Sequence, residues 1–302
     1  MFKSKNGMSR ALVRRETTAG YLFLLPSLFF FVTFVLYPMF LCIYTSFFDS
    51  NMGKNAVDVF VGLGNYKELF QDKLFLGALK NTVLIVVVAV PTVCAFSLWV
   101  ATAIYDMKPA LTSAFRCIFY LPVVTGSVAV TVVWKWMYNS RYGVFNYLFK
   151  SLGIIDQNIN WLGDARFALW CIILILFTTS VGQPIVLYVS ALGNVDHSLV
   201  EAAEVDGANR RQVFWKIKWA QIMPTTLYIL IITTINSFQC FALIQLLTSG
   251  GPTHSTDTIM YYIYYTAFKL YRYGYGNAMG VVLMVIIAVL SAVQFKLGQR
   301  SD

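Results

Sequence analysis

Residues 198–224 read SLVEAAEVDGANRRQVFWKIKWAQIMP, the longest polar interval near the middle of an otherwise strongly apolar chain. Ser198 stands three residues before Glu201, a spacing typical of a capped helix start. Gly207 can adopt a positive φ and end that helix, and Asn209, three residues before a glutamine, can cap a second one. We therefore expect two short helices joined at Gly207. A loop between apolar segments needs such order only where something docks on it.

The composition is that of a polytopic membrane protein. Of the 302 residues, 58% are hydrophobic and 12% are charged, and the mean hydropathy is +0.65, whereas soluble domains are about 25% charged. Apolar runs of about 20 residues match the thickness of a bilayer. In a soluble protein, a formal charge of +9 would indicate a nucleic-acid partner. Here the basic residues largely flank apolar runs and can face lipid headgroups, so no nucleic-acid partner is expected.

The runs predict an all-α fold with six transmembrane helices and both termini in the cytoplasm. The orientation follows from the basic residues before position 20 and from the inner placement of the polar loop. Residues 1–19 and 297–302 are expected to be cytoplasmic tails, and residues 20–296 the membrane domain. The predicted spans are 21–48, 81–105, 114–138, 167–192, 225–248 and 274–295.

Prolines and glycines predict where these helices are interrupted. Pro91 is expected to kink the second span, and Pro122 with Gly126 to break the third. Two helices are expected outside the spans. One runs from about 65 to 79 before the second span, and the other covers the tyrosine-rich segment 257–273 along the membrane interface.

The chain lacks the residues that ATP binding, catalysis or metal binding would need. Its one Gly-Lys pair, Gly53-Lys54, lacks the spacing of a phosphate-binding loop. No nucleophile and base can be matched, and neither His197 nor His254 has a partner at metal-ligand spacing. We expect no catalytic residue, metal site or cofactor in this chain. Five cysteines fall in apolar runs and are expected to pack as small side chains: Cys42, Cys94, Cys117, Cys171 and Cys240.

The apolar runs also carry almost no ionisable side chain in their interiors. Carriers driven by protons or sodium usually need such groups within the membrane. The energy for any transport is therefore expected from another protein. Two alternatives remain open, a self-sufficient secondary carrier or channel and an integral membrane enzyme.

The loop at Gly207 resembles the EAA loop of binding-protein-dependent ABC importer permeases. Glu201-Ala202-Ala203 precede Gly207 by three residues, and Ile217 follows it by nine; the family usually has Leu-Pro two residues after the Ile position, where this chain has Trp219-Ala220. In that family the loop forms a coupling helix that fits a cleft on a cytoplasmic ATPase. The resemblance implies a coupling loop at 193–224 with these residues: Glu201, Ala202, Ala203, Asp206, Gly207 and Ala208. The alternative is that Glu201 only caps a helix and the alanines only pack.

Two further segments resemble the sugar-importer subfamily, on the side of the maltose and glycerol-3-phosphate permeases. They are FVGLGNY at 60–66 and LLTSGGP at 246–252. The resemblance implies a type I permease fold in a bacterial cytoplasmic (inner) membrane, as the first of two different six-span permeases. It also implies two ATPase subunits that bind ATP and Mg²⁺, an extracellular solute-binding protein and a carbohydrate substrate. A polyol or a glycerol-3-phosphate-like solute is the alternative.

A substrate path through such a protein must be polar without being charged. Amide and hydroxyl groups can bond to sugar hydroxyls, and aromatic faces can stack on sugar C–H surfaces. The alternative is that these groups bond to neighbouring helices. The candidates on the fifth and fourth spans are Asn236, Ser237, Gln239, Phe241, Gln183 and Tyr188.

Overall fold

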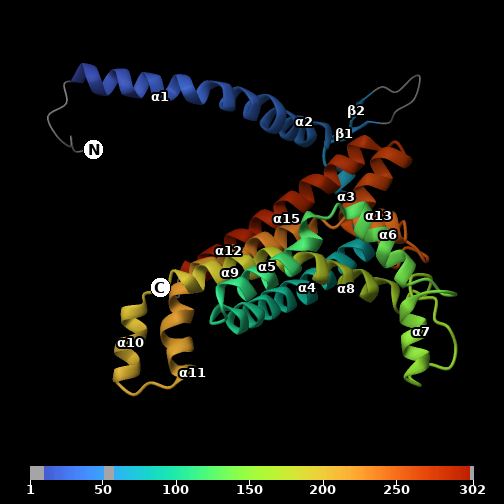
Figure 1. The fold of residues 1–302 in the computed structure, drawn as a ribbon. Coiled ribbons are helices and arrows are strands. Elements are labelled where there is room, and N and C mark those ends of the chain that lie inside the picture. The colour runs from blue at the N-terminus through green and yellow to red at the C-terminus, as the bar shows by residue number, and fades with distance from the viewer. Residues whose placement is uncertain (1–9, 51–57, 300–302) are drawn as a thin grey trace.

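The computed structural model describes residues 10–50 and 58–299, which form a helical bundle with one short two-stranded ladder (Figure 1). The first helices and the ladder are α1 (Arg10–Phe31), α2 (Tyr37–Thr45), β1 (Phe48–Asp49), β2 (Val59–Phe60) and α3 (Gly64–Gln71). The middle of the chain forms α4 (Lys73–Tyr105), α5 (Pro109–Val124), α6 (Ser127–Met137), α7 (Val144–Ser151), α8 (Ala168–Ser180) and α9 (Gly182–Gly193). The remainder forms α10 (His197–Val205), α11 (Arg210–Val213), α12 (Trp219–Phe238), α13 (Ala242–Leu247), α14 (Ile259–Tyr264) and α15 (Tyr273–Gln299). Three π-helical segments join neighbouring helices: Val32–Leu36, Phe214–Lys218 and Tyr265–Lys269.

The core of the bundle is built on α4, α9 and α12, with α5 and α15 packed against them. Lipid tails are as apolar as leucine, so close packing and interhelical hydrogen bonds stabilise such a bundle more than burial does. Ala101 and Ser97 of α4 are fully buried, and the Ser97 hydroxyl donates to the Val181 carbonyl at 3.3 Å. A Cβ on Gly182 would clash with the Phe119 carbonyl oxygen. Small side chains thus set how closely α9 approaches α4 and α5.

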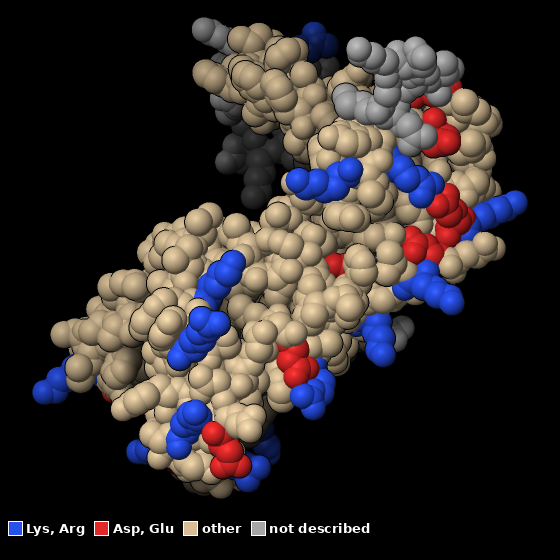
Figure 2. Space-filling view, turned by 90° about the vertical axis from the view of Figure 1, so that its right-hand side faces the viewer, with Lys and Arg blue, Asp and Glu red and all other residues tan. Residues whose placement is uncertain are grey.

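Five helical stretches are long and apolar enough to cross a membrane, and the predicted third span is the exception. There α5 and α6 meet at a bend of 95°. The break falls at Thr125 and Gly126, after Pro122, as the sequence predicted. The described residues therefore support five spans, or six if the bent pair counts as one, and a sixth continuous helix is not confirmed. Figure 2 shows a mostly uncharged face with charges in small groups, as expected for a membrane protein.

The helix that carries the second span begins at Lys73, before the predicted span boundary at 81. The helix expected over 65–79 is present as α3, but its predicted end is wrong: α3 ends at Gln71, and α4 runs unbroken from Lys73 through Pro91. The reason is Asp72, whose carboxylate accepts hydrogen bonds from the backbone N–H groups of Leu74 and Phe75 at 2.8 and 3.3 Å. An aspartate cap of this kind ends one helix and starts the next.

The first span stands apart from the bundle. In Figure 1, α1 extends away from the other helices, and α2 continues from it to reach the bundle, where it contacts α15. The span covers Thr17–Thr45, and none of its most apolar window is buried within this chain. Phe23, for example, is 86% exposed. An apolar helix this bare must be covered by lipid or by another protein.

The tyrosine-rich segment predicted over 257–273 is helical from Ile259 to Lys269, where α14 continues into a π-helical turn. Ile259 and Tyr262 are buried among side chains of α3, α4 and α15. The Tyr262 and Tyr275 hydroxyls donate to Asp72, at 2.7 and 2.9 Å. This segment thus ties the ends of α4 and α15 together.

Candidate functional site

Two regions carry the predicted functional residues, and the first is a helical hairpin made of α10 and α11. It projects from one end of the bundle (Figure 1). The predicted cap at Ser198 is wrong, because α10 begins at His197 and Asp196 caps it. The Asp196 carboxylate accepts from the Ser198 backbone N–H at 2.9 Å and from its hydroxyl at 2.7 Å. These bonds hold the Asp196 pKa below its ordinary value. An ionised carboxylate accepts more strongly than a serine hydroxyl, which explains why Asp196 takes the cap.

The turn of the hairpin follows the sequence prediction. Gly207 has φ +82° and ends α10. Asn209 and Gln212 form the reciprocal cap that starts α11. The Gln212 side chain accepts from the Asn209 N–H at 2.8 Å, and the Asn209 side chain accepts from the Gln212 N–H at 2.9 Å.

The second hairpin helix is not short, because it continues into the fifth span. The chain is helical from Arg210 through the π-helical segment Phe214–Lys218 into α12. The helix that carries this span therefore begins well before the predicted span boundary at 225. Pro224 lies inside α12 without ending it. One helical stretch thus connects the hairpin tip with Asn236, over about 27 residues or roughly 40 Å at 1.5 Å per residue.

The hairpin and the helical stretch that follows it expose apolar surface that no described element of this chain covers. Val205 is 88% exposed, and Leu199 and Trp215 are each about half exposed. A hollow of about 320 Å³ lies beside the turn, lined in part by Ala203 and Gly207. Exposed apolar surface with a polar surround is typical of a protein contact. All six predicted coupling residues lie on α10 or this turn: Ala203, Asp206, Gly207 and Ala208 line the hollow, whereas Glu201 and Ala202 are exposed on α10 and do not line it.

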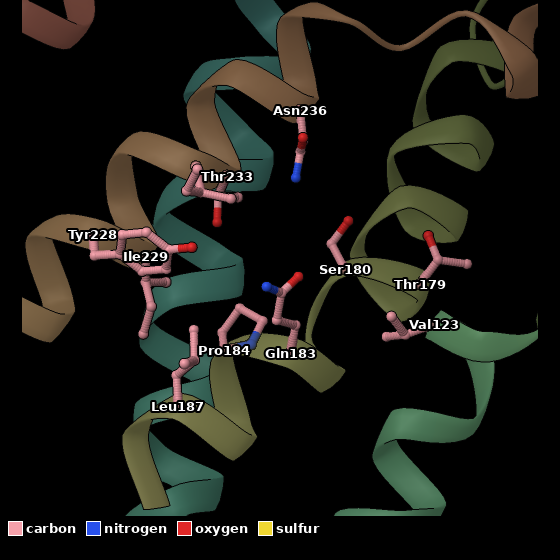
Figure 3. Close-up of a pocket in the computed structure, with 11 residues that line it drawn as sticks. Val123, Thr179, Ser180, Gln183, Pro184, Leu187, Tyr228, Ile229, Thr233 and Asn236 are labelled. Atoms are coloured by element: carbon pink, nitrogen blue, oxygen red, sulfur yellow. The ribbon is translucent and has the colours of Figure 1, made fainter. Parts of the chain in front are cut away.

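The second region is a cavity of about 160 Å³ inside the bundle, between α5, α9 and α12 (Figure 3). Gln183 from α9 and Asn236 from α12 point into it from opposite sides, with Ser180 and Thr233 between them. Tyr228 and Pro184 also line it. Amides and hydroxyls therefore converge on one space.

A second cavity of about 320 Å³ adjoins the first. Both are lined by Val123 and Thr179, so the two spaces share a wall. Gln239 and Phe241 line the second cavity, where a short non-helical segment separates α12 from α13. Together the cavities place amide and hydroxyl groups among apolar side chains beside the bend of α5 and α6.

The predicted path residues divide into two groups. Gln183, Asn236, Gln239 and Phe241 line the cavities. Ser237 and Tyr188 are each 1% exposed, and Tyr188 packs in the core around α4 and α9. Sequence reasoning did not single out Tyr228, Ser180, Thr179 and Thr233. For Tyr228 a signal exists, since Tyr228 and Asn236 are eight residues apart and share a helix face.

The amide side chains that line the cavities make no hydrogen bond within the described part of the chain. They belong to Gln183, Asn236 and Gln239. Many hydroxyls on the spans do make one: Thr82 and Thr226 donate to backbone carbonyls four residues earlier at 2.8 and 3.1 Å. The interhelical role considered as an alternative for these amides is therefore absent here. Nor do the described residues bring three His, Cys, Asp or Glu side chains together as metal ligands.

The chain is a bundle of apolar helices with amide and hydroxyl groups in internal cavities. One helical stretch connects these cavities with an exposed hairpin. These features are those of a membrane transport subunit. The family described as the inner membrane component of binding-protein-dependent transport systems matches residues 21–302. The chain belongs to this family.

Named relatives agree with this assignment. A probable ABC transporter permease protein, YesP of Bacillus subtilis, is 33% identical, with 94% of this chain and 91% of the relative covered. The lactose transport system permease protein LacF of Rhizobium radiobacter is 32% identical, with 94% and 95% covered. The multiple sugar-binding transport system permease protein MsmF of Streptococcus mutans is 31% identical, with 94% and 96% covered.

The fold is also that of a solved transporter. A chain of a bacterial alginate ABC transporter, solved in complex with a periplasmic protein bound to an alginate pentasaccharide, superposes with a TM-score of 0.82. The alignment covers 95% of this chain and 96% of that chain, at 24% identity. The helical arrangement described above is thus the ABC importer permease fold.

Proposed function

We propose that this chain is a permease subunit of an ATP-driven ABC importer that moves a sugar or oligosaccharide, delivered by an extracellular solute-binding protein, across a bacterial cytoplasmic membrane. The observation that carries the proposal is the helical continuity between the exposed hairpin and the cavity. Movement of the hairpin displaces α12, which carries Asn236. Such a displacement opens the cavities alternately to either side of the membrane.

In this proposal ATP and Mg²⁺ bind to two separate ATPase subunits. The hairpin of this chain fits a cleft on a cytoplasmic ATPase. The exposed apolar tip around Val205 supports a protein contact there. Glu201, Asp206 and Gly207 are each exposed on the hairpin. A Cβ on Gly207 would meet nothing within 4 Å, so a side chain there is limited by backbone strain and by whatever docks.

A second, different six-span permease completes the path. The bare first span supports this, because its apolar side chains need a cover that this chain does not supply. In this proposal the coupling loop at 193–224 and the tails at 1–19 and 297–302 lie in the cytoplasm, and residues 20–296 form the membrane domain that carries this loop. The basic residues before position 20 support this orientation.

The experiment compares Gly207→Leu with Gly153→Leu in the complete transporter, assembled with its ATPase, partner permease and binding protein in liposomes. Both glycines have positive φ, +82° and +67°, and a Cβ at either meets nothing within 4 Å. The two variants therefore carry similar backbone strain, and only Gly207 lies on the hairpin. Uptake in Gly207→Leu is expected to fall at least tenfold, while Gly153→Leu retains it.

Two results contradict the proposal. One is equal uptake and equal solute-stimulated ATPase activity in both variants and the wild type. The other is solute uptake by this chain and its partner permease without any ATPase, which instead identifies a secondary carrier.

A further inference from the structure

The residues that line the two cavities carry no charge. The eleven that line the smaller one are amides, hydroxyl-bearing side chains, a proline and aliphatic side chains. The larger cavity adds Gln239, Thr125, Ser127 and Phe241 to the same chemistry. Arg116 is the nearest cation along α5, but it lies seven residues before Val123, about 10 Å along the helix axis. It lines neither cavity.

The polar groups here suit a solute that both donates and accepts hydrogen bonds. An amide offers two N–H donors and a carbonyl acceptor, and a hydroxyl offers one donor and two lone pairs. A sugar or polyol hydroxyl matches both. A carboxylate or phosphate group only accepts, so it would bond to the amide N–H groups of Gln183 and Asn236 and leave their carbonyl oxygens without a donor. Burial of such an anion also needs a cation or a dense set of donors to replace water.

We infer that the solute carried through this chain is an uncharged polyhydroxylated compound, a neutral sugar or polyol, and that the path selects against phosphorylated polyols and uronic acids. This inference rests on the proposed function, because it assigns a substrate class to the same cavities. Gln183 and Asn236 act at the smaller cavity and Gln239 at the larger. Tyr228 and Phe241 supply aromatic surface for the C–H faces of the solute.

The charge of the path can be measured without knowing the solute. Asn236→Cys and Gln239→Cys, one in each cavity, are each assembled into the complete transporter. Their labelling rates, above those of the wild-type transporter with its own cysteines, are measured with three methanethiosulfonates. One reagent carries a trimethylammonium group, one a sulfonate group and one a neutral methyl group. The ratio of the cationic to the anionic rate is compared with the ratio for 2-mercaptoethanol in the same buffer.

A neutral path predicts ratios within about threefold of the free thiol at both positions. A ratio shifted more than tenfold toward the sulfonate reagent shows a positive path suited to anions. That result overturns the inference and leaves the proposed transport function standing. A tenfold shift toward the cationic reagent also overturns it. Failure of the neutral reagent to label either cysteine in an assembled transporter removes the path itself, and the inference with it.

Discussion

The hydroxyl of Tyr262 donates a 2.7 Å hydrogen bond to the carboxylate of Asp72, across 190 residues of sequence. Tyr275 donates to the same oxygen at 2.9 Å, while the other carboxylate oxygen caps α4. Nearby, Arg272 forms a two-pronged ion pair with Glu68, both bonds at 2.8 Å. One carboxylate thus joins α4, α14 and α15 at the end of the bundle remote from the hairpin.

Asp72→Ala is expected to lower the free energy of unfolding by about 2 kcal/mol, because it removes a helix cap and leaves two tyrosine hydroxyls without an acceptor. Thermal unfolding in detergent measures the loss. Asp164→Ala is the control, since Asp164 pairs only with Arg166 on the surface, where such pairs contribute under about 1 kcal/mol. Equal losses in the two variants would show that the hydrogen bonds of Asp72 stabilise the fold no more than the surface pair of Asp164 does.

The Asp72 contribution is also expected to depend on pH. Partial burial raises the pKa of this carboxyl. Hydrogen bonds from Tyr262, Tyr275 and two backbone N–H groups together outweigh that effect and hold the pKa below its ordinary value. An acid with a lowered folded-state pKa stabilises the fold above its unfolded pKa, near 3.9, and loses that effect as the pH falls through the folded value. The stability gap between wild type and Asp72→Asn should therefore persist from pH 7 to about 4 and shrink below it. A gap that instead widens in acid would show the opposite sign of shift.

Gly182→Ala is expected to destabilise the bundle by about 1–3 kcal/mol, because the added methyl group meets the Phe119 carbonyl and the Val123 side chain. Val123 lines both cavities, so solute uptake should fall as well. Gly77→Ala provides the control on α4, where a Cβ has nothing within 4 Å. Alanine there should be neutral or stabilising by up to about 1 kcal/mol. A destabilised Gly77→Ala beside an unaffected Gly182→Ala would contradict this account of the helix packing.

Much of the fold follows from local patterns in the sequence. The apolar runs predicted the five long apolar helices, Pro122 with Gly126 predicted the bend, and Asn209 with Gln212 predicted a cap, because each depends on residues close in sequence. Where two local signals compete, the sequence alone misleads. Asp196 and Ser198 both suit a helix cap, and only the carboxylate forms it. The change from polar to apolar residues near Pro224 resembles a boundary, although nothing between Arg210 and Phe238 ends the helix.

The cavities were only partly accessible to sequence reasoning. Asn236 and Gln239 stand out as amides in an apolar run. Ser237, between them, turns into the core because neighbouring positions on a helix face about 100° apart. Val123 and Thr179 come from other helices, and their place in the walls depends on how α5 and α8 pack. No single-helix periodicity contains that information.

Asn236→Ala and Gln183→Ala are each expected to raise the half-saturation concentration for uptake by about 3–10-fold, the effect of losing one hydrogen bond of 0.5–1.5 kcal/mol. Assembly should be unaffected, because neither amide bonds to the protein. Asn158→Ala on an exposed loop is the matched control. Unchanged half-saturation in both amide variants would remove them from the path. Loss of assembly in either would show a structural role instead.

The helical connection between the hairpin and α12 gives the last prediction. Lys218 lies at the junction of the π-helical segment and α12, with its ammonium 5.5 Å from the centre of the Tyr105 ring. Lys218→Gly combined with Ala220→Gly should soften this connection, since each glycine weakens a helix by about 1 kcal/mol relative to alanine. The control is Lys218→Ala, which loses the same contact with Tyr105 but keeps helix-forming residues at both positions. If the connection transmits motion, ATP hydrolysis continues in the double-glycine transporter while uptake per ATP falls at least threefold below the alanine control. Equal uptake per ATP in the two would show that the hairpin acts on the cavity by another route, through α9 and α10.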